Sequence, residues 1–124
     1  MEKKKILIVD DEEKFGRMVK LILEATGRYE VIVESRGKQA LPTIRLHQPD
    51  LILLDISIPD MDGSEVAAQM KEDPVLKNIP VIFLTGIVSR EETGPHSKIG
   101  GRPIIPKPVS ADELIQAIEK NLRK

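Results

Sequence analysis

The stretch LILLDISIPDMDG at residues 51–63 sets the fold expected for this chain. Its first four residues are all apolar, which is typical of a strand buried on both faces of a parallel sheet. Asp55 follows directly, at a position where a carboxylate is unfavourable unless it has a partner. Pro59 and Gly63 then indicate a turn, and we expect Ser64 to cap a helix that ends near Lys71. This stretch therefore predicts a buried strand that carries an acidic side chain to one edge of a sheet.

Similar strand and helix patterns alternate on both sides of this stretch. Apolar runs predict further strands at residues 6–9, 31–33, 81–84 and 104–105. Apolar residues at helical spacing predict helices at residues 15–23, 38–46 and 110–122. Five strands that alternate with helices predict an α/β fold with a doubly wound, five-stranded parallel sheet.

Two of the predicted helices contain residues that disturb a helix. Pro42 falls inside the second one, and we expect that helix to start late or to kink, because proline has no N–H and crowds the preceding turn. The fourth helix is expected at residues 89–100, but Gly94 and Pro95 fall in its middle. We therefore expect an irregular fourth helix.

The composition fits one small domain with an aliphatic core. The chain has 124 residues, 40% of them hydrophobic, with no Trp, one Tyr and two Phe. Its formal charge of −1 gives no field that would attract nucleic acid or a membrane surface, and no apolar run approaches the ~18–20 residues of a membrane span. The absence of cysteine excludes a thiolate nucleophile and a thiolate metal site. We expect a cytoplasmic domain that contacts neither nucleic acid nor membranes directly.

Polar side chains follow the predicted strands at the points where they end. Asp10 and Asp11 follow the first strand, Asp55 the third, Thr85 the fourth and Lys107 the fifth. The carboxyl ends of parallel strands meet at one edge of the sheet, where α/β proteins bind their ligands. Each residue taken singly has a structural alternative, and Asp11 in particular could cap the first helix. Three carboxylates, a hydroxyl and an ammonium group at one edge instead predict a functional site.

Three carboxylates at one edge need a cation if all are to stay ionised at neutral pH. Oxygen ligands with open coordination positions suit Mg²⁺, which can offset the charge of a phosphoryl group beside Asp55. Lys107 and Thr85 would contact the other phosphoryl oxygens. Since aspartate is a covalent phosphoryl carrier in enzymes, we expect Asp55 to form and lose an acyl phosphate.

These motifs resemble those of the receiver domains of two-component response regulators, with the single-domain chemotaxis regulators among them. The resemblance extends over residues 4–122 and rests on Asp10-Asp11, on Asp55 followed by Pro59, Asp62 and Gly63, on Thr85-Gly86 and on Lys107-Pro108. It implies a flavodoxin-like (βα)5 fold with the strand order 2-1-3-4-5.

The resemblance also implies roles for these residues. Asp55 would accept a phosphoryl group from the phosphohistidine of a histidine kinase or phosphotransfer protein, in a reaction that depends on Mg²⁺. The metal ligands would be Asp10, acting mainly through water, Asp11, Asp55 and the backbone carbonyl of Ser57. Lys107 would pair with the phosphoryl group, and the Lys107–Pro108 peptide bond would be cis. Such a domain is a signalling switch and no enzyme in the ordinary sense, because it catalyses only its own phosphorylation and slow autodephosphorylation.

Two features differ from the usual pattern of this family. Its members often carry Tyr or Phe three residues before the lysine, where this chain has Ile104, so a switch that couples Thr85 to an aromatic ring cannot operate in its usual form. Gly94-Pro95 lies on the face where partners usually dock. We expect a downstream protein to bind the face around the fourth helix, through rearrangement of residues 87–101. We also expect residues 1–124 to form the receiver domain alone, without an output domain, as a stand-alone regulator or a fragment.

The sequence leaves three alternatives open. A phosphatase with an aspartyl nucleophile would normally need a second Asp, as general acid, at the position of Ser57. A flavodoxin-like flavin module would need a phosphate-binding loop after the first strand, where residues 10–13 are all acidic. The third alternative is a receiver that has lost phosphorylation and only binds partners, which the complete set of site residues opposes.

Overall fold

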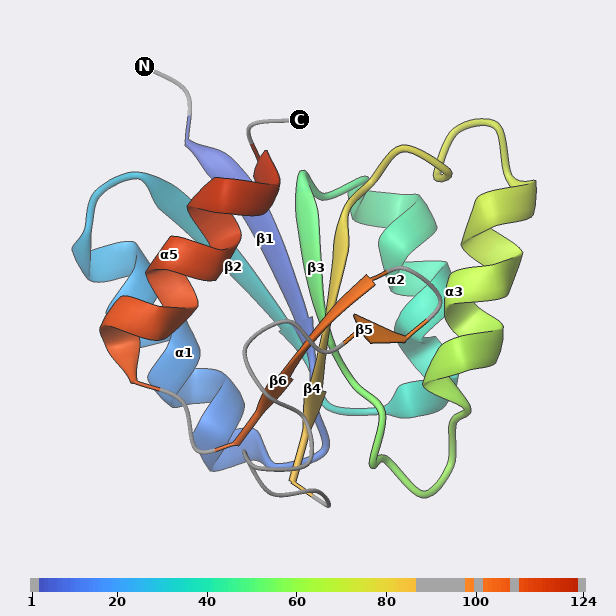
Figure 1. Ribbon diagram of the computed structural model, residues 1–124, viewed down its shortest axis with the longest axis horizontal. Coiled ribbons are helices and arrows are strands. Elements are labelled where there is room, and N and C mark those ends of the chain that lie inside the picture. Colours follow the sequence, from blue (N-terminus) through green and yellow to red (C-terminus); the bar gives the residue numbers. More distant parts are fainter. Residues whose placement is uncertain (1–2, 87–97, 100–101, 108–109, 123–124) are drawn as a thin grey trace.

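A central sheet with helices on both faces forms this protein (Figure 1). The computed structural model describes residues 3–86, 98–99, 102–107 and 110–122. Five strands run parallel, in the spatial order β2-β1-β3-β4-β6. Their bounds are β1 (Lys4–Val9), β2 (Tyr29–Glu34), β3 (Leu51–Asp55), β4 (Val81–Thr85) and β6 (Arg102–Pro106). These strands confirm the doubly wound parallel sheet and its predicted order of 2-1-3-4-5.

A sixth strand was not expected from the sequence. β5 (Lys98–Ile99) pairs antiparallel with β6 at the edge of the sheet, with Lys98 opposite Pro103 and Ile99 opposite Arg102. The prediction of a helix at residues 89–100 is therefore wrong at Lys98 and Ile99. The rest of the expected fourth helix, Gly94-Pro95 included, lies outside the described residues. The sequence does carry a hairpin signal here in Gly100-Gly101, a pair that favours two-residue turns between antiparallel strands.

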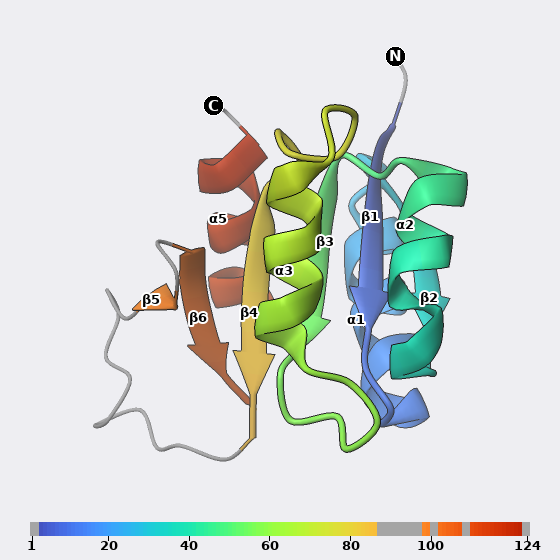
Figure 2. The ribbon, with the colours of Figure 1, turned by 90° about the vertical axis from the view of Figure 1, so that its right-hand side faces the viewer.

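The sheet divides the core into two layers, each covered by helices. One cluster lies under α1 (Glu13–Ala25) and α5 (Ala111–Leu122), and the other under α2 (Ala40–His47) and α3 (Gly63–Glu72) (Figure 2). In β1, Ile6 and Ile8 belong to the first cluster, whereas Leu7 and Val9 belong to the second. Side chains alternate between the two faces of a strand, so a strand covered on both faces is apolar at every position.

The helix boundaries confirm one detail predicted from the sequence and correct another. α2 begins at Ala40, after the 3-10 turn η1 (Gly37–Gln39), so Pro42 lies in the first turn, where its missing N–H costs no hydrogen bond. This is the late start that was expected. The predicted cap of α3 is wrong, because the side chain of Asp62 accepts hydrogen bonds from the N–H groups of Ser64 and Glu65. Ser64 therefore lies inside the helix that it was expected to cap.

The final helix begins as its sequence predicts. The Oγ atom of Ser110 accepts a hydrogen bond from the N–H of Glu113 at 3.1 Å, and the carbonyl oxygen of Ser110 accepts one from Leu114 at 3.0 Å. The first bond satisfies one of the backbone donors that the first turn of a helix leaves unpaired, and the second is the first regular bond of the helix. Leu114 and Ile118 then point into the core, which fixes α5 beside α1.

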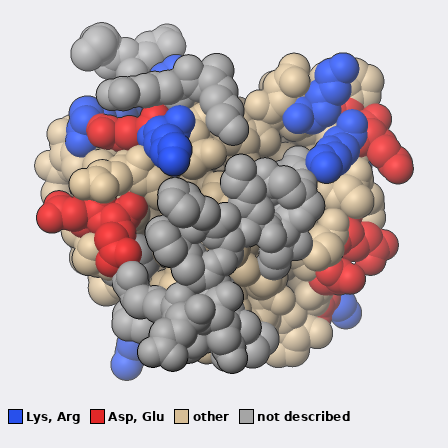
Figure 3. Space-filling view, in the orientation of Figure 1, with Lys and Arg blue, Asp and Glu red and all other residues tan. Residues whose placement is uncertain are grey.

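The described surface carries both signs of charge. On the face drawn in Figure 3, acidic and basic side chains are interspersed. Within the part of the chain that the structure describes, no helix has both the length and the apolar character that crossing a membrane would require.

Gly37 holds the loop after β3 close to η1. A Cβ atom built on this glycine would lie 2.5 Å from Cβ of Met61 and 2.6 Å from Oδ1 of Asp60. The next N–H, that of Lys38, donates to Oδ2 of Asp60 at 3.3 Å. The loop that follows Asp55 is therefore held against η1 by close packing and one hydrogen bond.

Replacing Gly37 by alanine is expected to destabilise the protein by about 1–3 kcal/mol, because the loop must move to make room. Urea unfolding followed by circular dichroism measures this difference. Lys38→Ala is the matched control, because the exposed Lys38 side chain lies on the same turn and its N–H is kept. Equal stability of the two variants would contradict the close packing.

Candidate functional site

The predicted site residues meet at one edge of the sheet. The parallel strands run downward in Figure 1, so that their carboxyl ends share the lower edge. Among the described residues, the buried polar side chains are those of Asp10, Asp55 and Thr85, with exposures of 0%, 0% and 1%. All three lie at this edge, at the ends of β1, β3 and β4. Because burial disfavours unpaired polar groups, this concentration marks the edge as the place where polar side chains have a specific role.

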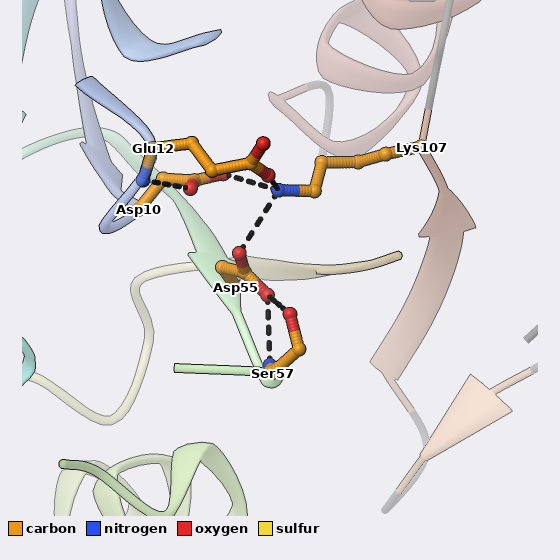
Figure 4. Close-up of polar contacts among 5 residues, drawn as sticks. All are labelled: Asp10, Glu12, Asp55, Ser57 and Lys107. Atoms are coloured by element: carbon orange, nitrogen blue, oxygen red, sulfur yellow. Dashed lines mark hydrogen bonds and ion pairs between the residues drawn. The ribbon is translucent and has the colours of Figure 1, made fainter. Parts of the chain in front are cut away.

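Lys107 connects the acidic residues of this edge (Figure 4). Its Nζ atom lies 3.0 Å from Oδ2 of Asp10 and 3.0 Å from Oδ2 of Asp55, and it also contacts a carboxylate oxygen of Glu12. The backbone N–H of Lys107 donates to the carbonyl oxygen of Thr85 at 2.7 Å, which fixes the start of the side chain. Only 8% of the side chain is exposed, so these charge-assisted hydrogen bonds are weakly screened by water. They raise the pKa of Lys107, although its burial acts in the opposite direction.

Asp55 is held as a carboxylate by donors on both of its oxygens. Its Oδ1 atom accepts hydrogen bonds from the Ser57 N–H at 2.7 Å and from the Ser57 hydroxyl at 2.5 Å. Its Oδ2 atom accepts the bond from Lys107. Burial alone would raise the pKa of Asp55, but the bonds from Ser57 and Lys107 outweigh it and lower that pKa. The side chain is therefore an ionised group that water cannot reach readily.

Asp10 has the opposite balance. The pKa of Asp10 is raised from 3.8 to about 6, chiefly by desolvation on burial and to a smaller extent by the nearby charge of Asp55. The Glu12 N–H, which donates to Oδ1 of Asp10 at 2.9 Å, and the Lys107 ammonium act against this rise without cancelling it. Asp10 is thus a carboxylate that gains from an additional cation nearby.

Three carboxylates at this edge lie close enough to share one ion. Oxygen atoms of Asp10, Asp11 and Asp55 all lie within 4.8 Å of one another. Asp11 is exposed, so one side of the group opens to solvent. It does not cap α1, whose N-cap residue is Glu12. An all-oxygen donor set that is open on one side and includes a carboxylate of raised pKa fits a hard divalent cation such as Mg²⁺.

Comparison with known proteins agrees with this geometry. The family model of the response regulator receiver domain matches residues 6–119. This chain belongs to the response regulator receiver family. Receiver domains are signalling domains of two-component systems and are not enzymes in the ordinary sense, which sets aside the phosphatase and flavin-module alternatives.

Individual receiver domains are similar along almost the whole chain. The polar-differentiation response regulator DivK of Brucella anthropi is 36% identical over 119 residues, which cover 96% of each protein. The CheY-like receiver domain protein of Methanospirillum hungatei is 32% identical, with a TM-score of 0.82 over 98% of this chain and 95% of the other. The chemotaxis response regulator CheY4 of Vibrio cholerae is 26% identical, with a TM-score of 0.81 over 97% and 99% of the two chains.

The receiver domain contains contacts that the sequence analysis missed. Glu12 reaches Lys107, the Ser57 hydroxyl donates to Asp55, and Nζ of Lys107 lies 4.7 Å from the centre of the Phe15 ring. Glu12 stands in a run of four acidic residues that looks alike along the chain, so no sequence signal distinguishes it from Glu13. Phe15 was expected only in the apolar face of α1.

Three further predictions concern Ile104, the Lys107–Pro108 peptide bond and Thr85. Ile104 is buried in the cluster under α2 and α3 and pairs with Phe83 across β4 and β6, so this position holds an aliphatic side chain within the core. The isomer of the Lys107–Pro108 bond lies outside the described residues, because Pro108 does. Thr85 lies one residue beyond Leu84, the residue that pairs with Asp55 in the sheet.

Proposed function

We propose that Asp55 accepts a phosphoryl group from a phosphohistidine of a histidine kinase or phosphotransfer protein. The observation that carries this proposal is the buried, ionised carboxylate of Asp55 with Lys107 on one oxygen and two further carboxylates beside it. The ionised carboxylate is the nucleophilic form of an aspartate side chain. The lowered pKa of Asp55 keeps its side chain in this form at neutral pH.

The proposed transfer is balanced within the site. A carboxylate oxygen of Asp55 forms a bond to phosphorus while the bond from phosphorus to the histidine nitrogen of the donor breaks, and the histidine keeps the electron pair. Lys107 stabilises the negative charge on the transferred group, because its ammonium already lies 3.0 Å from the accepting carboxylate. Thr85 is assigned a contact to another phosphoryl oxygen, in agreement with its place at the end of the neighbouring strand. Later attack by water on the acyl phosphate gives slow autodephosphorylation.

The same residues would bind Mg²⁺. Its ligands are assigned to Asp10, Asp11, Asp55 and the backbone carbonyl of Ser57. The bound ion would supply positive charge that offsets the repulsion between these carboxylates and the phosphoryl group. The raised pKa of Asp10 supports this assignment, because a cation beside this buried carboxylate would offset the unfavourable free energy of keeping it ionised.

Phosphorylation is proposed to change the binding of a downstream protein. The surface assigned to that partner is the face around residues 87–101, most of which lies outside the described residues. The described edge supports such a coupling through Lys107, which is bonded to Asp55 through its side chain and to β4 through its backbone. Residues 1–124 are assigned to the receiver domain, and we place it in the cytoplasm without direct contacts to nucleic acid or membranes.

Intact mass spectrometry tests the proposed function. Incubation with acetyl phosphate and Mg²⁺ is expected to add one phosphoryl group per chain, and chelation of the metal should abolish most of this gain. Asp55→Asn should show no gain, because the amide is a poor nucleophile. Asp50→Asn is the matched control at the other end of the same strand and should be labelled like the wild type. Absence of a mass gain with any small phosphodonor would favour a receiver that only binds partners.

A further inference from the structure

Three carboxylates share the ammonium group of Lys107, but their surroundings differ. Asp10 and Asp55 are buried, with side-chain exposures of 0% and 1%, whereas the Glu12 side chain is 65% exposed. The three carboxylates approach Lys107 from two strand ends (Figure 4). Asp10 and Glu12 lie in the turn after β1, and Asp55 ends β3.

An ammonium group has three N–H donors, and here each has a carboxylate to bond. A phosphoryl oxygen can therefore bond Lys107 only if one carboxylate gives up its place. Withdrawal of Asp10 or Asp55 would leave a buried oxygen with fewer donors, which is unfavourable. Withdrawal of Glu12 costs little, because water replaces the lost bond on an exposed side chain.

We propose that Glu12 is a positioning residue that occupies the Lys107 donor later used by the phosphoryl group. This inference rests on the proposed function of Asp55 and Lys107 and adds a built-in competitor to it. Glu12 holds the ammonium in place before phosphorylation, and it competes with any tetrahedral anion that enters the site. Its carboxylate thereby lowers both the rate of phosphorylation and the affinity for a phosphoryl mimic.

Phe15 supports this exchange from the same end of α1. The Lys107 ammonium lies 4.7 Å from the centre of the Phe15 ring, within the range of cation–π contacts. The ring has no hydrogen-bonding group that could compete for the donors, and it packs against the cluster under α1 and α5. It can therefore keep Lys107 at the site while Glu12 leaves the ammonium.

Glu12→Gln tests the proposal, with Glu13→Gln as its matched control. Glu13 is the adjacent residue, is exposed and carries the same charge, so the control removes one negative charge without touching the described contacts of Lys107. The rate of phosphorylation by acetyl phosphate is expected to rise about two- to fivefold in Glu12→Gln, the size expected for an exposed ion pair, and to change far less in Glu13→Gln. Equal rates in the two variants would overturn the proposal, since a general effect of charge would then be sufficient.

Two further measurements separate competition at Lys107 from a structural role. The affinity for beryllofluoride, measured by NMR titration in the presence of Mg²⁺, should rise by a similar factor in Glu12→Gln, with no matching change in the melting temperature. In a Lys107→Ala background, Glu12→Gln should leave the phosphorylation rate unchanged, and a persisting rise would show that Glu12 acts without Lys107. Failure of the wild type to be labelled at all would instead reject the proposed function.

Discussion

Lys107→Ala is expected to lower the free energy of unfolding by about 2–4 kcal/mol at pH 7.5 without divalent cations. The substitution removes the ammonium group from two carboxylates that are almost completely buried, those of Asp10 and Asp55. Loss of one partner of a buried ion pair is much more unfavourable than loss of an exposed pair. The decrease should be smaller than the largest values known for a broken buried ion pair. The reason is that Asp10, whose pKa is already about 6, can take up a proton and lose its charge. Addition of millimolar Mg²⁺ should restore part of the lost stability, since a bound cation replaces the missing charge.

The same substitution should slow labelling by acetyl phosphate about 100-fold or more, because it removes the donor that stabilises the transferred phosphoryl group. Lys20→Ala is the matched control for stability, since Lys20 makes an exposed pair with Glu24 at 3.9 Å and should contribute less than about 0.5 kcal/mol. Urea unfolding with and without Mg²⁺ measures the first effect, and the time course of the mass gain measures the second. If Lys107→Ala were as stable as the wild type without divalent cations, the carboxylates could not be ionised against this lysine.

Asp10→Asn is expected to stabilise the protein at pH 7 by about 1–3 kcal/mol while it weakens Mg²⁺ binding. Burial raises the pKa of Asp10 from 3.8 to about 6, so the folded protein holds this proton more tightly than the unfolded chain does. The stability of the wild type therefore falls as the pH rises from about 4 to about 6, and it stays reduced above that range. The asparagine cannot lose a proton, so its advantage over the wild type should grow through this window and then become constant. The gain in stability should stay below the full free energy of the pKa shift, because the substitution also removes the negative charge that pairs with the Lys107 ammonium.

Asp11→Asn separates the stability effect from the metal effect. Asp11 is exposed, so its amide should change the stability little, yet it belongs to the same group of carboxylates and should also weaken Mg²⁺ binding. Unfolding curves between pH 5 and pH 7.5, together with calorimetric titration of Mg²⁺, distinguish the two variants. A stability difference between Asp10→Asn and wild type that does not depend on pH would contradict the raised pKa of Asp10.

The apolar strands were predictable because burial on both faces leaves an unmistakable run of apolar residues. Residues 51–54 and 81–84 lie in β3 and β4 as expected, and their neighbours Asp55 and Thr85 end those strands at one edge. The topology of a parallel sheet then brings those ends together, so the position of these side chains at one edge also followed from the sequence.

The features that the sequence did not reveal depend on contacts between distant parts of the chain. Glu12 and Lys107 are 95 residues apart, and nothing local separates Glu12 from its acidic neighbours. Asp62 caps α3 in place of Ser64, because both residue types suit a cap and the turn geometry decides between positions two residues apart. β5 is only two residues long, too short for any periodicity, and its pairing with β6 alone makes it a strand.

The most direct test of the account is chemical identification of the residue that carries the phosphoryl group. An acyl phosphate is reduced by borohydride, which would convert a phosphorylated Asp55 into homoserine. Peptide mass spectrometry after treatment with acetyl phosphate, Mg²⁺ and borohydride should find homoserine at position 55 and unmodified side chains at Asp10, Asp11 and Ser57. Reduction at Asp10 or Asp11, or a phosphate ester on Ser57 with Asp55 intact, would contradict the assignment of Asp55 as the phosphoryl acceptor.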